Sequence, residues 1–258
     1  MRVASWNVNS LRARLEHLST WLGQAAPDVV CIQETKVEDA KFPEGAIGDM
    51  GYRTLFFGQK TYNGMAIALR FGVTAEDVKY NLDGDDAEAP RRLIACTVDG
   101  VRILNVYVPN GQAVGTPAFA YKLVWLDRLR LELATHHRPD EMLLVCGDFN
   151  VAPDPIDVHD PARWEGQVLF HPDEPAALAR LREWGLVDGF RAHHHEGGAF
   201  TWWDYRLGMF RRNWGLRIDH ALMTAPLAAR CTDVWIDRRP RELERPSDHA
   251  PLIVEIGS

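Results

Sequence analysis

The chain contains eight short runs rich in Val, Ile and Leu, and several of them are apolar at every position. The clearest is Met-Leu-Leu-Val-Cys at residues 142–146. A strand with one face in water alternates apolar and polar residues, so an uninterrupted apolar run indicates a strand covered on both faces. The chain must therefore enclose its strands between other layers. The predicted strands span residues 2–8, 28–33, 64–70, 93–98, 101–108, 142–146, 217–223 and 252–256.

Helical patterns lie between these runs. We expect Ser10 to cap a helix in which leucines repeat at three- and four-residue steps as far as Leu22. A stripe of leucines predicts a second helix over residues 117–136. A third is predicted over 175–184, after an acidic first turn and before Gly185.

One pair of strands carries a clear hairpin signal, because Asp99-Gly100 joins residues 93–98 to 101–108. Hairpins combined with helix-separated strands predict an α/β fold with mixed sheets covered by helices, rather than a pure parallel barrel. No segment has the composition of a linker, so we expect a single domain over residues 1–258.

Composition excludes several classes of protein. The 258 residues are 46% hydrophobic and 25% charged, as in an ordinary globular protein, and no apolar stretch is long enough to span a membrane. Residues 1–7 resemble a strand and not a signal peptide, so we expect a cytoplasmic protein. No CxxC pair indicates zinc, and the cysteines are predicted to be buried reduced thiols at Cys31, Cys96, Cys146 and Cys231.

The formal net charge is −7, which is the wrong sign for a protein held to nucleic acid by bulk positive charge. Either nucleic acid is not the partner, or a local basic face and a metal ion offset the carboxylates. Total charge leaves both possibilities open.

Polar side chains with catalytic chemistry stand where the apolar runs end. Strand ends in layered α/β folds aim side chains into a common crevice, although each residue alone is equally consistent with an ordinary turn. As a set they offer mainly oxygen donors and no thiolate, which suits a hard cation such as Mg²⁺ or Mn²⁺. No Walker or Rossmann glycine motif indicates a nucleotide cofactor. The set is Asn7, Glu34, Tyr107, Asp148, Asn150, Asp219, Asp248 and His249.

Seven motifs occur in a characteristic order along essentially the whole chain. They are Asn-Val-Asn with Ser-Leu-Arg-Ala-Arg at 7–14, Gln-Glu-Thr-Lys at 33–36, Tyr-Val-Pro-Asn-Gly at 107–111, Gly-Asp-Phe-Asn at 147–150, Thr-Trp-Trp-Asp-Tyr-Arg at 201–206, Arg-Ile-Asp-His at 217–220 and Ser-Asp-His-Ala-Pro at 247–251. Together they resemble the bacterial exodeoxyribonuclease III family, within the endonuclease/exonuclease/phosphatase superfamily that includes DNase I and abasic-site endonucleases.

The resemblance implies a four-layer sandwich, in which two mixed sheets pack face to face with helices outside. It also implies metal-dependent hydrolysis of DNA: incision 5′ to abasic sites, 3′→5′ exonuclease activity and 3′-phosphatase activity, with the balance among them open. The expected partner is duplex DNA with abasic sites or blocked 3′ ends, bound by a monomer without membrane attachment. The expected cofactor is Mg²⁺, with Mn²⁺ as an alternative.

The same resemblance assigns roles to the metal and water ligands. Glu34 is the main metal ligand, with Asn7 close by and Asp248 as a further ligand. Asp148 orients or deprotonates the attacking water, and Asn150 holds that water or the phosphate.

Three residues are implied to act on the phosphate. His249 would hydrogen-bond the scissile phosphate, while Asp219 orients the imidazole and favours its cationic form. Tyr107 would donate to a phosphate oxygen.

The substrate-binding prediction centres on residues 202–217, an aromatic stretch with four arginines against one acid. By resemblance, Trp202 and Leu216 line a pocket for the sugar of an abasic site. Asn9 stands where some relatives have an aspartate, and it is also assigned to substrate binding. The arginines are Arg206, Arg211, Arg212 and Arg217.

Other interpretations remain at this stage. The same scaffold could hydrolyse soluble or lipid phosphates, or the chain could bind nucleic acid without catalysis. The tract His193-His194-His195 is interpreted as an exposed loop and not as a metal site.

Overall fold

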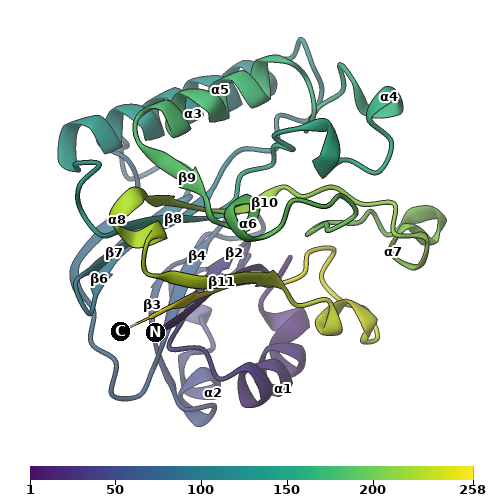
Figure 1. Cartoon of the computed structure of the whole chain (residues 1–258). Coiled ribbons are helices and arrows are strands. Elements are labelled where there is room, and N and C mark those ends of the chain that lie inside the picture. The colour runs from purple at the N-terminus through teal and green to yellow at the C-terminus, as the bar shows by residue number, and fades with distance from the viewer. Residues whose placement is uncertain (258) are drawn as a thin grey trace.

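Two β-sheets packed face to face form the centre of the molecule, and helices cover their outer faces (Figure 1). The computed structural model describes residues 1–257. The strand order of the first sheet is β11 (Cys231–Ile236), β12 (Leu252–Ile256), β1 (Arg2–Asn7), β2 (Val29–Gln33), β4 (Met65–Arg70) and β3 (Tyr52–Phe57). The order of the second is β5 (Glu76–Tyr80), β6 (Leu93–Val98), β7 (Val101–Tyr107), β8 (Leu143–Asp148), β10 (Asp219–Thr224) and β9 (Leu186–Asp188).

The longer helices lie outside these sheets. On the first sheet lie α1 (Leu15–Ala25) and α2 (Glu44–Asp49), and on the second lie α3 (Pro117–His136) and α5 (Asp173–Glu183) (Figure 1). No helix within residues 1–257 is both long and apolar enough to cross a membrane. The shorter helices are α4 (Pro161–Trp164), α6 (Gly189–His193), α7 (Met209–Arg212) and α8 (Ala225–Ala228).

Both sheets are mixed, as the sequence predicted. The β1–β2 and β7–β8 pairs are parallel, and the other neighbouring strands are antiparallel. The hairpin between β6 and β7 is present, and both of its turn residues, Asp99 and Gly100, have positive φ. The expected four-layer sandwich is therefore confirmed.

The uninterrupted apolar run in β8 has a simple explanation in the layers. Leu144 and Cys146 pack between the two sheets, whereas Leu143 and Val145 pack beneath α3 and α5. Because successive side chains point to opposite faces and both faces are buried, no position in the run can be polar.

The eight predicted strands are all present, and the four that were not predicted are the four edge strands of the two sheets. Most residues of β3, β5 and β11 are exposed or half-buried, and β9 has only three residues. An edge strand with one open side does not need a continuous apolar sequence. The pattern used to find strands therefore detects only interior ones.

The predicted Ser10 cap is wrong. Residues Arg12–Arg14 form a 3₁₀ turn before α1, and α1 begins at Leu15 without a side-chain cap. The backbone N–H of Ser10 instead donates to the Glu34 carbonyl at 2.8 Å. The backbone of Ser10 is therefore hydrogen-bonded to the residue that follows β2, and the helix starts later in the chain. By contrast, α3 has the predicted bounds, and α5 begins two residues before the predicted start.

The prediction that Arg217 belongs to a basic surface is also wrong, because its side chain is completely buried. Its guanidinium donates to Asp157 at 2.7 Å and to Asp188 at 2.8 Å. A buried charge is tolerated only when it is paired and hydrogen-bonded, and both conditions are met here. The cluster ties β9 and β10 to the loop that follows β8. All four cysteines are free, and only Cys231 is not buried.

His220 completes this buried cluster. Its Nδ1 lies 3.0 Å from an Arg217 nitrogen, and its Nε2 lies 2.8 Å from the Val151 carbonyl oxygen. Since a guanidinium can only donate, Nδ1 accepts and the proton is on Nε2. Burial, reinforced by the Arg217 charge, lowers the pKa of His220 to about 4.

We predict that His220→Gln weakens the dependence of folding stability on acid. The unfolded histidine has a pKa near 6.5, so neutral His220 stabilises the fold above that pH and loses this contribution as pH falls toward 4. The free energy of unfolding of the wild type should fall by up to about 3 kcal/mol more than that of the variant over this range. Urea unfolding at pH 7, 5.5 and 4.5 measures it, and equal pH dependence in both proteins would contradict the assignment.

Candidate active site

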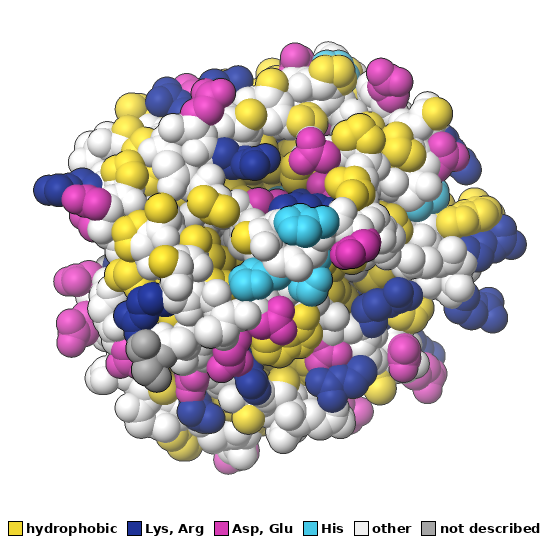
Figure 2. Space-filling view, viewed as in Figure 1, with side chains coloured by type: hydrophobic (Ala, Val, Ile, Leu, Met, Phe, Trp, Pro, Cys, Tyr) yellow, Lys and Arg dark blue, Asp and Glu magenta, His cyan; other side chains and the backbone are white. Residues whose placement is uncertain are grey.

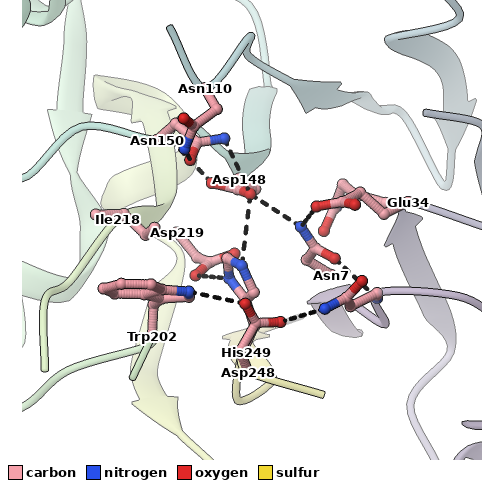
Figure 3. A network of polar contacts seen from close by, with 12 residues as sticks. Asn7, Glu34, Asn110, Asp148, Asn150, Trp202, Ile218, Asp219, Asp248 and His249 are labelled. Atoms are coloured by element: carbon pink, nitrogen blue, oxygen red, sulfur yellow. Dashed lines mark hydrogen bonds and ion pairs between the residues drawn. The ribbon is translucent and has the colours of Figure 1, made fainter. Parts of the chain in front are cut away.

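The sandwich brings the predicted polar residues together where strands of both sheets end, and Figure 3 shows seven of these eight residues side by side. Parallel β1 and β2 end here, as do parallel β7 and β8. Antiparallel β10 starts there, and Asp219 is in register with Asp148. Side chains separated by up to 242 positions, Asn7 and His249, thus approach the same carboxylate.

Asp148 lies at the centre of the cluster and is buried. Its carboxylate accepts hydrogen bonds from the Asn7 amide at 2.9 Å, from the Asn150 backbone N–H at 2.8 Å and from the Asn150 amide at 3.2 Å. Burial raises the pKa of Asp148 to about 7, although the neighbouring His249 cation opposes the rise. The group can therefore exchange a proton near neutral pH.

His249 bridges two carboxylates. Its Nδ1 donates to Asp219 at 2.9 Å, and its Nε2 lies 3.7 Å from an Asp148 oxygen. Burial lowers the pKa of His249, but Asp219 and Asp148 outweigh burial and raise it to about 10. The imidazole is thus held as a cation and in one orientation, as the sequence analysis expected.

Glu34 follows β2 and has a positive φ of 53°. One carboxylate oxygen accepts from the Asn7 amide at 2.8 Å, and the other lies 2.8 Å from the Lys36 ammonium. Lys36 was not assigned a role from the sequence. Glu34 also lines an open cavity of about 470 Å³ together with Arg92 and Tyr107.

Asp248 contacts the amide nitrogen of Asn9, whereas Lys36 contacts the amide oxygen of the same side chain. The Asp248 carboxylate accepts from Asn9 at 2.9 Å and from the Trp202 indole N–H at 2.9 Å. Burial raises the pKa of Asp248, but the His249 cation and these two donors keep it below its ordinary value. Asp248 does not contact Glu34 directly: Asn9 links it both to Lys36 and to Asn7, and each of these contacts Glu34.

The donor chemistry nevertheless fits a hard cation. Glu34, Asn7 and Asp248 offer oxygen atoms and no sulfur, and the Lys36 ammonium beside Glu34 shows that a positive charge is accommodated there. Asp219 also has one buried carboxylate oxygen without a hydrogen-bond partner in the described residues. Such an atom in a native site indicates that a water or an ion is part of the arrangement.

Tyr107 ends β7 beside these groups. Burial, followed by the negative charges of Glu34 and Asp148, raises the pKa of Tyr107 well above its ordinary value. The Arg92 guanidinium lies 4.7 Å from the centre of its ring. Tyr107 therefore keeps its proton and can act only as a neutral donor or acceptor.

Comparison with known proteins identifies the family of the chain. A family model described as the endonuclease/exonuclease/phosphatase family matches residues 4–249. The chain belongs to this family. Exodeoxyribonuclease III of Haemophilus influenzae is 33% identical over 267 residues, covering 99% of each chain.

Two solved structures of the family match 100% of this chain and 100% of their own. One is an AP endonuclease from Archaeoglobus fulgidus, with 40% identity and a TM-score of 0.95. The other is the 3′ phosphatase NExo from Neisseria bound to product DNA hairpin, with 41% identity and a TM-score of 0.94. The sandwich of this family member is thus shared along its whole length.

The predicted substrate residues have different surroundings. Trp202 is half-buried beside the cluster of Asp148, Asp219 and His249, and backbone bridges join it to Leu216 and His249. Leu216 is adjacent, as expected, but completely buried. Arg206 is 82% exposed and paired with Asp204, while the exposed arginines on α7 are Arg211 and Arg212.

Lys122, a buried lysine that was not predicted from the sequence, holds the backbone next to the site. The Lys122 ammonium donates to the backbone carbonyls of Asn150 at 2.6 Å and Asn110 at 3.1 Å, and it forms a buried ion pair with Glu174. The Asn110 amide in turn donates to the Asn150 side chain at 3.0 Å. The sequence did contain a signal for Lys122: it is a polar residue on the apolar face of a helix, three positions after Phe119.

Within residues 1–257, one other group of acidic and histidine side chains lies close enough together to hold a metal ion. Asp83, Glu132 and His136 lie close together near the far end of α3, but Lys79 already pairs with both carboxylates. His193 is the last residue of α6, whereas His194 and His195 lie in the loop after it, so the loop prediction is wrong for His193 alone. Figure 2 shows histidine side chains at the surface there, and His194 hydrogen-bonds a backbone carbonyl at 2.6 Å.

We predict that Lys122→Met destabilises the protein by about 3–5 kcal/mol, because it leaves the Glu174 charge buried without a partner. Adding Glu174→Gln should recover part of this loss. Urea unfolding of both variants gives the measurement, and a single variant as stable as the wild type would show that the pair does not support these loops.

Proposed function

We propose that the protein is a divalent-metal-dependent DNA repair nuclease. It hydrolyses phosphodiesters 5′ to abasic sites in duplex DNA and also removes nucleotides and phosphates from 3′ ends. The observation that carries the proposal is the buried arrangement of Asp148, His249 and Asp219 next to Glu34. The names of the relatives, which include an exodeoxyribonuclease III, an AP endonuclease and a 3′ phosphatase, support it.

The reaction begins with the attacking water. Asp148 is suited to accept a proton from it, because burial has moved the pKa of this carboxyl close to 7. The backbone and amide N–H groups of Asn150 keep the carboxylate in place. The water then attacks phosphorus in line with the leaving 3′ oxygen.

His249 and Tyr107 serve the negative charge that develops on the phosphate. Both retain a proton at neutral pH, His249 because Asp219 and Asp148 stabilise its cation and Tyr107 because it is buried near two carboxylates. Donors already fixed in position stabilise such a charge without reorganising.

Glu34 is the principal ligand that we assign to the metal, with Asn7 and Asp248 as additional oxygen donors. A bound Mg²⁺ would neutralise phosphate charge and stabilise the leaving oxygen, and Mn²⁺ has suitable chemistry as well. Without such a cation, Glu34, Asp148 and Asp248 would repel a phosphodiester.

The remaining residues are assigned to substrate binding. Trp202 and Leu216 are assigned to the sugar of the abasic site. Asn9 and the arginines on the projecting α7 segment are assigned to the DNA backbone, which offsets the negative charge of the whole chain (Figure 1). The acting species is proposed to be a cytoplasmic monomer.

The test uses the full chain and labelled duplexes that carry either one abasic site or a 3′-phosphate. We expect cleavage with Mg²⁺ and none with excess chelator. Asp148→Asn should reduce turnover by about 10²–10⁴-fold, since it removes the proton acceptor and little volume. The exposed Asp140→Asn variant is the matched control and should retain activity.

Two results would count against this proposal. Undiminished cleavage in chelator would exclude the metal-dependent mechanism, and normal turnover by folded Asp148→Asn would exclude the assigned base. Preferential hydrolysis of an inositol phosphate over either DNA would favour the alternative phosphatase function.

A further inference from the structure

Leu216, which we assign to the substrate sugar, and its neighbour Ile218 form an apolar wall, and another part of the chain covers this wall. Leu216 is 0% exposed and Ile218 is 1% exposed, so neither side chain offers surface to a ligand. They belong to an apolar cluster against which Trp164 and Trp202 pack. The two indole rings are perpendicular, with centres 6.3 Å apart. Figure 3 shows Ile218 and Trp202 next to Asp219.

Trp164 packs on this cluster together with Val168, Phe170 and Trp202. Its other side lines a cavity of about 450 Å³ together with His159, Arg163 and Arg206. Trp164 therefore contacts both the cavity and the cluster that contains Leu216, and we expect removal of the indole to connect them.

The segment that carries Trp164 is held in place at several points. Asp160 caps α4 by accepting from the Arg163 backbone N–H at 3.2 Å. His159 stacks on Trp214 with ring centres 6.0 Å apart, and Val158 forms a backbone bridge with Leu216. Trp164 thus covers the wall as part of an anchored loop.

The three proposed reactions differ in what this covered wall must accommodate. Each breaks the bond between phosphorus and the 3′ oxygen: water adds to phosphorus, one water proton passes to Asp148, and the 3′ oxygen leaves and takes a proton from solvent. In abasic incision a sugar stays attached to the phosphate, and in exonuclease action a whole nucleotide does. In 3′-phosphate removal nothing further is attached, and inorganic phosphate leaves.

We propose that Trp164 is a specificity-determining residue that closes the sugar pocket and so favours 3′-phosphate removal over abasic incision and nucleotide removal. This inference rests on the proposed nuclease function and identifies the preferred substrate of the same site. A group attached to the phosphate beside His249 must enter the space next to Trp202, which bridges to Leu216. A phosphate monoester needs none of that space.

The experiment compares three duplexes of one sequence, which carry a 3′-phosphate, a tetrahydrofuran abasic analogue or an unmodified recessed 3′ end. We measure kcat/KM with Mg²⁺ for the wild type, Trp164→Ala and the milder Trp164→Leu. Trp184→Ala, a half-buried tryptophan packed on the outer core of the second sheet, is the matched control. Thermal unfolding verifies that each variant is folded.

The wild type should favour 3′-phosphate removal over abasic incision by at least about tenfold in kcat/KM. Trp164→Ala should raise incision about tenfold and leave 3′-phosphate removal unchanged, with a smaller effect for Trp164→Leu and none for Trp184→Ala. Equal wild-type activity on the two substrates would overturn the inference, as would an unchanged ratio in a folded Trp164 variant. Both results leave the nuclease function intact, whereas no Mg²⁺-dependent cleavage of any duplex would overturn that function as well.

Discussion

The hydrogen bond from Asn7 to Asp148 joins the two sheets at the site. Asn7 ends β1 of the first sheet and Asp148 ends β8 of the second, and their side chains meet at 2.9 Å. The hydrogen bond from His249, just before β12 of the first sheet, to Asp219 in β10 of the second crosses the same boundary. Neither sheet alone contains the cluster of Asn7, Asp148, Asp219 and His249, so its geometry depends on how accurately the sandwich packs.

Buried amides beneath the site help to set that packing. Gln33 donates to Asn105 at 2.7 Å, and Asn105 donates to the Ala66 carbonyl at 2.9 Å, so polar contacts cross an otherwise apolar interface. An unsatisfied buried polar group costs about 1–3 kcal/mol, and a shift of one sheet against the other would leave these groups unpaired. We therefore regard them as a constraint on the relative position of the sheets.

Much of this arrangement could be predicted from the sequence because its signals are local. Interior strands can be recognised as apolar runs, and the residues that end them form motifs. Asp148 and His249 could therefore be predicted to lie together, as the structure shows. The Ser10 cap failed because a contact with distant Glu34 determines the backbone there. Lys122 was missed because helix periodicity says that a residue faces inward but not which carbonyls it meets.

The sequence by itself determined the layers, the order of the motifs and the kind of chemistry, since periodicity and residue type are properties of short segments. Only the tertiary structure decided which charges are buried together and which surfaces are open. Arginine is usually a surface residue, yet Arg217 is buried and pairs with two carboxylates from other segments. Leu216 stands in the expected motif, yet Trp164 from a separate loop packs on its cluster. Burial is a sum over contacts between distant parts of the chain, and no local pattern contains that sum.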